Sequence, residues 1–280
     1  MSASQPAPRG PGEPIYRVEP LTTHTHTILL LHGLGSNGEK FGKELLETGI
    51  TSSGLTLPQL LPGARFLFPT SRRRRSTAFG RSMLTQWFDI ANLQDPELRK
   101  EKQLKGLGES AQELFAIVQK ELEMVPARNL ILGGLSQGCA IGYLTYQSDL
   151  QDSLAENEED TQRDLDEENP FSTPEVAGER PHPSVQAQNF ERDLLGLQPL
   201  EEPAREKTAY GTPVFLGHGV KDEKVPLGLG TSAARVVRSA GYEVRWRAYE
   251  ELGHWYQVPE EVDDIVDFIS SVVGWPVSHG

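Results

Sequence analysis

This chain of 280 residues contains a single cysteine, carries no net positive charge and lacks long apolar runs. The single cysteine, Cys139, excludes an intramolecular disulfide and suits a reducing compartment. No run approaches the roughly 18 consecutive apolar residues that a transmembrane helix requires. The net charge of -13 argues against binding to nucleic acid and allows at most transient contact with an anionic membrane. Charge and composition therefore favour a protein that acts in the aqueous phase.

Two further absences concern targeting and metals. Residues 1–8 lack the charged start and apolar core of a secretory signal, so we expect a cytoplasmic protein, with the nucleus as an additional location. His24 and His26 alternate before an apolar run, but no Cys, Asp or third His stands at ligand spacing from them. No metal site is expected there.

Composition divides the chain into one predicted domain and two polar segments. Residues 1–14 form a Pro/Gly tail that we expect to be disordered. Residues 151–206 are rich in Asp, Glu, Pro and Gln, and we expect a disordered acidic insertion there. The remaining ranges, 15–150 and 207–274, are predicted to form a single α/β domain.

Hydrophobic patterns predict the elements of that domain. Apolar runs predict strands over 15–21, 27–31 and 64–69, the first at a sheet edge, and helical spacing predicts helices over 107–125, 232–240 and 258–272. Strands that alternate with helices indicate a mostly parallel sheet with helices on both faces. The basic run 72–75 is expected to be a solvated loop, with binding of nucleic acid or lipid phosphate as the alternative.

The pentapeptide Gly134-Leu135-Ser136-Gln137-Gly138 follows an apolar strand and precedes a helix-like stretch. This order is what a nucleophile elbow requires, because the serine must stand on a sharp turn and the flanking glycines leave room for strand and helix to cross. We therefore predict that Ser136 is a catalytic nucleophile.

A serine hydroxyl needs a general base, and the base needs an orienting carboxylate. Downstream, Asp222 and His254 each follow a short predicted strand, so both are expected at the sheet edge that carries the serine. Asp222 is preferred to the adjacent Glu223 because it lies nearer its strand end. His32 and His218 also lie at strand ends, but we interpret both as hydrogen-bonded loop residues rather than as the base.

The strand over 28–31 runs into His32-Gly33-Leu34-Gly35. Such a loop can stabilise the oxyanion of a tetrahedral intermediate through its backbone N–H groups. The predicted donors are the N–H groups of Leu34 and Gln137. A phosphate-binding loop is the competing interpretation, but the loop lacks the lysine and glycine spacing of nucleotide-binding motifs.

Five motifs in order carry a family resemblance: His32-Gly33-Leu34-Gly35, Gln86-Trp87-Phe88-Asp89, Gly133-Gly134-Leu135-Ser136-Gln137-Gly138, His218-Gly219 with Asp222-Glu223-Lys224-Val225-Pro226, and Gly253-His254-Trp255. Together they resemble the acyl-protein thioesterase branch of the phospholipase/carboxylesterase family of α/β-hydrolases. The resemblance covers residues 25–148 and 210–272. It implies an α/β-hydrolase fold and hydrolysis of acyl thioesters and esters, such as palmitoyl groups on protein cysteines, lysophospholipids and small esters, and so a part in lipid and fatty acid metabolism.

The resemblance also places Trp87 and Phe88 beside the acyl site, as substrate-binding residues; surface packing of an aromatic pair is the alternative. The fold it implies contains a strand between the nucleophile helix and the strand before Asp222. No apolar β-like run supplies that strand over 150–208. Either Val214–Leu216 takes the neighbouring position, or the sheet lacks an interior strand.

The sequence thus predicts a serine hydrolase that acts on S-acylated proteins or small acyl esters without metal or organic cofactor. A general short-chain carboxylesterase is one alternative. The other is a non-catalytic α/β-hydrolase-like protein whose acidic segment binds a partner.

Overall fold

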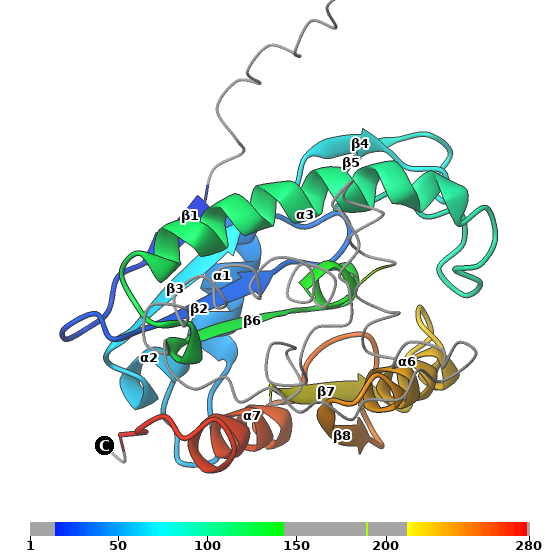
Figure 1. Ribbon diagram of the computed structural model, residues 1–280. Helices are drawn as coiled ribbons and strands as arrows, with labels where there is room; N and C mark the ends of the chain where they lie inside the picture. The colour runs from blue at the N-terminus through cyan, green and yellow to red at the C-terminus, as the bar shows by residue number, and fades with distance from the viewer. Residues whose placement is uncertain (1–14, 143–188, 190–211, 279–280) are drawn as a thin grey trace, which may run out of the picture.

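The computed structural model describes residues 15–142, 189 and 212–278 (Figure 1). Its larger sheet contains β1 (Ile15–Val18), β3 (Ala64–Pro69), β2 (His26–Leu31) and β6 (Leu130–Gly134), in that order across the sheet. β2 is parallel to both β3 and β6, whereas β1 runs antiparallel to β3 at the edge. The predicted edge strand and the mostly parallel sheet are therefore confirmed, although β1 ends at Val18 rather than at residue 21.

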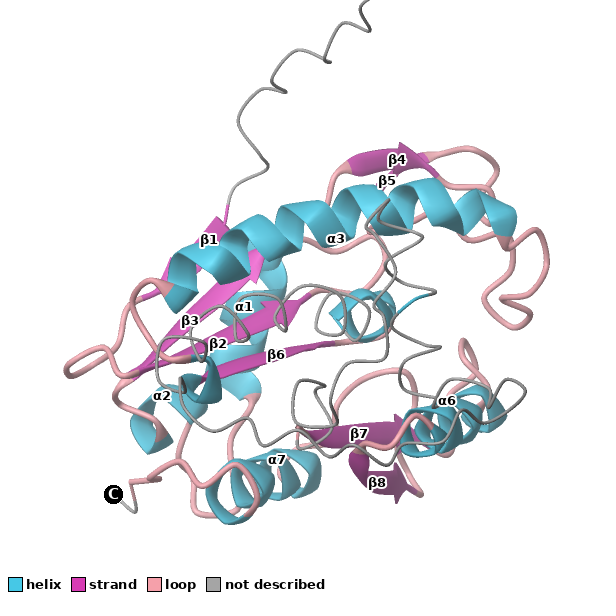
Figure 2. Cartoon of the chain, viewed as in Figure 1, coloured by secondary structure: helices cyan, strands magenta, loops and turns pink. Residues whose placement is uncertain are grey.

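Helices cover both faces of this sheet (Figure 2). Alternate residues of β2 and β3 point to opposite faces, since the side-chain period of a strand is two. Leu29, Leu31 and Leu67 join a core cluster with Ala111, Leu114 and Val118 of α3 (Glu101–Leu122). Ile28, Phe66 and Phe68 join another with α1 (Gly38–Thr48) and α7 (Glu260–Ser271). The apolar strands are thus buried on both sides, as parallel strands require.

The second sheet is a parallel pair of β7 (Pro213–Gly219) and β8 (Glu243–Tyr249), packed with α6 (Leu227–Ser239). β7 pairs with β8 and not with β6, so the interpretation in which Val214–Leu216 takes the position beside β6 is wrong. Within the described ranges, no strand lies between β6 and β7. The predicted tail over 1–14 and the predicted insertion over 151–206, Asn189 aside, lie outside the described residues.

The basic run is a strand rather than a solvated loop. β4 (Arg73–Arg75) pairs antiparallel with β5 (Met83–Thr85) in a hairpin. Arg74 contacts Glu109 of α3 at 2.5 Å, and Arg72 forms an ion pair with Glu113 of the same helix. Arg73 and Arg75 are exposed to solvent, as expected, but the acidic partners of Arg72 and Arg74 lie 35 or more residues downstream, where the local sequence does not reveal them.

The remaining described elements are α2 (Leu57–Leu60), the 3-10 turn η1 (Ala127–Asn129) and the helical residues 137–142 that follow β6. None of the described helices combines the length and the apolar character needed to cross a bilayer.

Candidate active site

Ser136 stands on a strained turn between β6 and a helix that begins at Gln137. Its φ of 56° lies in the left-handed region, which residues with a side chain rarely adopt. Two glycines make the turn possible. A Cβ on Gly134 would lie 2.6 Å from the backbone carbon of Gly138, and a Cβ on Gly138 would clash with the backbone of Leu31 in β2. This local geometry is that of a nucleophile elbow.

Asp222 lies in the loop after β7, three residues beyond Gly219. Its Oδ1 accepts hydrogen bonds from the backbone N–H groups of Lys224 at 2.8 Å and Val225 at 2.9 Å. Burial alone would raise the pKa of Asp222, but the hydrogen bonds from Val225, His254 and Lys224 outweigh it, so the pKa lies below its ordinary value. The carboxylate is therefore ionised and can only accept hydrogen bonds.

His254, in the loop after β8, joins Asp222 to Ser136. Its Nδ1 lies 2.7 Å from Asp222 Oδ2, and its Nε2 lies 3.0 Å from Ser136 Oγ. Because Asp222 accepts, Nδ1 carries the proton and Nε2 is left to accept from the serine hydroxyl. The three side chains that the sequence singled out thus meet at hydrogen-bond distances, although β6, β7 and β8 belong to two sheets.

The His-Gly loop lies next to the nucleophile. A Cβ on Gly33 would be 3.5 Å from Ser136 Cβ and 4.0 Å from its Oγ. His32 is fully buried; its Nδ1–H donates to Gly33 O at 2.7 Å, and its Nε2 accepts from the N–H of Ser71 at 3.0 Å. Burial lowers the pKa of His32, which keeps the ring neutral. The interpretation of His32 as a hydrogen-bonded structural residue is confirmed.

Comparisons with known proteins agree with this arrangement. A sequence model described as phospholipase/carboxylesterase matches residues 17–153 and 196–273. The chain belongs to the phospholipase/carboxylesterase family. "Acyl-protein thioesterase 1" of Neurospora crassa is 25% identical over 259 residues, which cover 90% of this chain and 89% of the relative. Its counterpart in Yarrowia lipolytica is 26% identical over 92% of this chain and 97% of the relative.

A solved structure, acyl-protein thioesterase 2 of Zea mays, matches with a TM-score of 0.61 at 26% identity, over 94% of this chain and 100% of its own. The predicted α/β-hydrolase fold and the resemblance to acyl-protein thioesterases are thereby confirmed. The matches to the family model leave out residues 154–195, which lie within the predicted acidic insertion.

In this member of the phospholipase/carboxylesterase family, Trp87 and Phe88 are buried, with 2% and 5% of their surface exposed. The alternative of surface packing is therefore wrong. The N–H of Trp87 donates to Gln137 Oε1, the Nε2 of Gln137 donates to Phe88 O, and the indole N–H of Trp87 donates to His32 O. These bonds tie the aromatic pair to both the elbow and the His-Gly loop. The side-chain bonds of Gln137 are not predictable from the elbow motif, which assigns only a backbone role to the residue after the serine.

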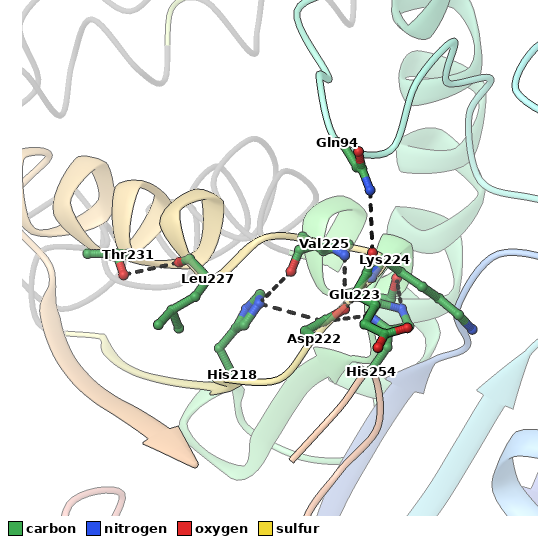
Figure 3. A network of polar contacts seen from close by, with 10 residues as sticks. Gln94, His218, Asp222, Glu223, Lys224, Val225, Leu227, Thr231 and His254 are labelled. Carbon is green, nitrogen blue, oxygen red and sulfur yellow. Dashed lines mark hydrogen bonds and ion pairs between the residues drawn. The ribbon is translucent and has the colours of Figure 1, made fainter. Parts of the chain in front are cut away.

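The other residues considered for catalysis or metal binding make different contacts: Glu223 as the alternative acid, and His24 and His26 as possible metal ligands. The backbone carbonyl of Glu223 accepts a long bond from Gln94 at 3.4 Å, and His254 pairs with Asp222 instead (Figure 3). His26 packs its ring 4.3 Å from that of Trp275, and the Nε2 of His24 lies 2.9 Å from the Thr27 hydroxyl. Over the described ranges, no group of three or more possible metal ligands occurs.

Proposed function

We propose that this chain is a serine hydrolase that cleaves acyl thioesters and esters. The observation that carries the proposal is the continuous set of hydrogen bonds from Asp222 through His254 to Ser136. Membership of the phospholipase/carboxylesterase family supports the same chemistry. The arrangement matches the requirements for activating a serine: a base in contact with the hydroxyl and a carboxylate that fixes the base.

In the proposed reaction, Ser136 Oγ attacks the acyl carbonyl while His254 Nε2 takes the hydroxyl proton. The tetrahedral intermediate collapses to an acyl-enzyme, and the imidazolium returns its proton to the departing thiol or alcohol. Water then attacks the acyl-enzyme with His254 again as base, which releases the fatty acid and the free serine. Asp222 accepts from Nδ1–H throughout: it fixes the tautomer of the neutral imidazole and stabilises the imidazolium that forms. These side chains carry every proton, so the reaction needs neither a metal nor an organic cofactor.

We further propose that the N–H groups of Leu34 and Gln137 stabilise the oxyanion, a contribution of about 3 kcal/mol for each donor in such sites. The proximity of Gly33 to Ser136 Oγ supports this role. Trp87 and Phe88 are proposed to border the acyl chain. Their hydrogen bonds to the Gln137 side chain and to the His32 carbonyl, which connect the pair to the segments that carry the two proposed donors, support this placement.

The proposed substrates are S-acylated proteins, in line with the thioesterase names of the relatives, with lysophospholipids or small carboxylic esters as further substrates. This substrate class fits a protein of the cytoplasm, with the nucleus as an additional location. A general short-chain carboxylesterase is the second candidate, because the family description includes such enzymes. The thioesterase and the carboxylesterase can be distinguished by comparing kcat/KM for a palmitoyl-thioester peptide with kcat/KM for a short-chain ester. A thioesterase should prefer the peptide. Comparable values for both, or a preference for the short ester, would favour the carboxylesterase.

The first test is covalent labelling with a fluorophosphonate, which reacts with an activated serine. The wild type and Ser270→Ala, a change on α7, should be labelled, whereas Ser136→Ala should not. Loss of the nucleophile should lower kcat by about 10⁴–10⁶. Circular dichroism and the melting temperature serve as fold controls. If Ser136→Ala hydrolyses within tenfold of the wild type, the chain is not a serine hydrolase of this type, and a wild type that is folded but unlabelled would favour the non-catalytic alternative.

A further inference from the structure

His218 lies on β7, one residue before the strand ends, and its side chain is only 13% exposed. Its Nε2 is 3.0 Å from the carbonyl oxygen of Val225 and 3.6 Å from Asp222 Oδ2 (Figure 3). The distance of 3.6 Å between His218 and Asp222 is too long for a hydrogen bond, but it is short enough for an electrostatic interaction between the imidazole and the carboxylate. Asp222 Oδ2 therefore faces two imidazoles, those of His254 and His218.

The position of the His218 proton follows from its partner. A carbonyl oxygen only accepts, so Nε2 carries the hydrogen and donates it to Val225 O. The N–H of the same Val225 donates to Asp222 Oδ1 at 2.9 Å. Val225 is thus held from both sides, by the imidazole at its carbonyl and by the carboxylate at its N–H. This leaves Oδ2 of Asp222 directed at His254 Nδ1.

The ring of His218 is itself held by packing against α6. A Cβ on Gly230 would lie 2.5 Å from His218 Nδ1 and 2.9 Å from the end of the Trp246 ring. Only a glycine lets the helix lie this close. Gly228, in the same helix and two residues earlier, has open space around the corresponding position. Alanine substitutions at Gly230 and Gly228 therefore make a matched comparison, because both lie in α6 and only the first would contact His218.

We propose that His218 is a positioning residue that orients the Asp222 carboxylate toward His254 through the backbone of Val225. The inference rests on the hydrolase proposed above, in which Asp222 directs the general base. A buried histidine with a merely structural role would affect stability but would not act through Asp222. The difference is measurable because the proposed role requires the Asp222 carboxylate.

The first experiment compares two replacements. His218→Leu removes the donor, and we expect kcat to fall about tenfold, the value of one hydrogen bond, with KM unchanged. His218→Gln carries an amide N–H near the position of Nε2 and should stay within about threefold of the wild type. In an Asp222→Asn background, His218→Leu should cause no further loss, because the group through which it acts is absent.

The second experiment leaves His218 in place. Gly230→Ala should displace the ring and lower kcat severalfold, whereas Gly228→Ala should leave it unchanged. Melting temperatures of all variants separate loss of fold from loss of orientation. Equal losses in His218→Leu and His218→Gln, additive losses with Asp222→Asn, or equal rates in the two glycine variants would each overturn the inference. If Asp222→Asn itself retains wild-type activity, the proposed triad fails; if Asp222→Asn is inactive and His218→Leu matches the wild type, only the role of His218 fails.

Discussion

The adjacent acidic residues Asp222 and Glu223 allow a test of which carboxylate orients His254. Asp222 accepts from His254 at 2.7 Å, whereas the contact of Glu223 in this region is through its backbone carbonyl. Asp222→Asn should lower kcat by about 10⁴, because the amide favours the wrong imidazole tautomer. Glu223→Gln should remain within about twofold, the size of a surface effect. Steady-state kinetics on one ester substrate is sufficient, and the reverse order of the two variants would assign the orienting role to Glu223.

A second residue, Glu261, should make the stability of the protein depend on pH, because its carboxyl is buried. Its carboxyl packs against Gly217 in β7, where a Cβ would clash with it, and Oε2 accepts from the N–H of Gln257 at 2.8 Å. Burial raises the pKa of Glu261 to about 7; the Gln257 bond opposes this shift, and the nearby Asp264 carboxylate adds to it. Tyr249 donates to that carboxylate, and Arg247 lies 3.4 Å from it.

The sign of the effect on stability follows from linkage. The folded protein retains the Glu261 proton up to about pH 7, whereas the unfolded chain releases it near 4.5. The contribution of this group to stability therefore falls as pH rises between these values and is constant above them. Relative to Glu261→Gln, the wild type should lose on the order of 2–3 kcal/mol between pH 5 and pH 8. Urea denaturation of both proteins at the two pH values measures this difference, and parallel pH profiles would show that Glu261 titrates normally.

The catalytic candidates were predictable from the sequence because their positions depend on local signals. Ser136 and Asp222 each follow an apolar strand, and His254 follows the alternating strand β8. The carboxyl ends of the paired parallel strands β7 and β8 share one edge, which brings Asp222 and His254 together. His218 is expected from the sequence to be a hydrogen-bonded loop residue; the hydrogen bond is present, but the residue lies within β7 and not in the loop after it. Its significance depends on the carbonyl of Val225 and on how closely α6 approaches, which is three-dimensional information. The same applies to the side chain of Gln137, whose partners lie about fifty positions upstream.

At the scale of elements, the elbow depends on two chain segments that nearly touch. A Cβ on Gly138 would clash with Leu31 O in β2, whereas a Cβ on Gly142 in the same helix would meet neighbours at 3.5 Å or more. Gly138→Ala should cost about 3 kcal/mol and abolish labelling by a fluorophosphonate, since the clash is with backbone. Gly142→Ala should be neutral or stabilise the helix by up to about 1 kcal/mol. Chemical denaturation with labelling compares them; equal stability and labelling would show that the crossing can relax.

Helices and strands were predicted best where one apolar stripe dominates. The strand at 64–69 agrees with β3, and the helix over 232–240 lies largely within α6, which starts earlier at Leu227. The helix over 107–125 in fact begins at Glu101, because its first turn is polar and carries no stripe. α1 and the β4–β5 hairpin were missed. β4 consists of three arginines and so carries no apolar alternation, and the ion pairs from Arg72 and Arg74 to α3 join segments that are distant in the sequence.

At the scale of the whole molecule, the candidate site joins parts of the chain that are distant in sequence. Ser136 follows β6 of the larger sheet, while Asp222 and His254 follow the paired strands β7 and β8. From its composition, we propose that residues 151–206 are an insertion between these two parts of one domain. The family match supports this division, since it resumes at residue 196 after ending at 153.

Limited proteolysis tests that division. A protease specific for glutamate should cut first within 151–206, because acidic segments with few apolar residues bury little surface. The two products should stay associated on gel filtration, and a fluorophosphonate should still label the fragment that contains Ser136. Ser136 lies on the fragment before the cut and Asp222 on the fragment after it. A digested Asp222→Asn sample is therefore the control, since loss of labelling in this sample shows that labelling requires both fragments. Digestion that removes the folded ranges as fast as this segment would mean that the domain does not hold together without it.

The left-handed φ of 56° at Ser136 also restricts which amino acids could evolve or be engineered at this position. A side chain that branches at Cβ meets its own backbone in that conformation, so threonine, although it carries the same hydroxyl, is a poor replacement. Cysteine is unbranched and fits the same turn. A change from an alcohol to a thiol nucleophile is therefore open to this scaffold in one substitution, while a change from a primary to a secondary alcohol would require a different backbone.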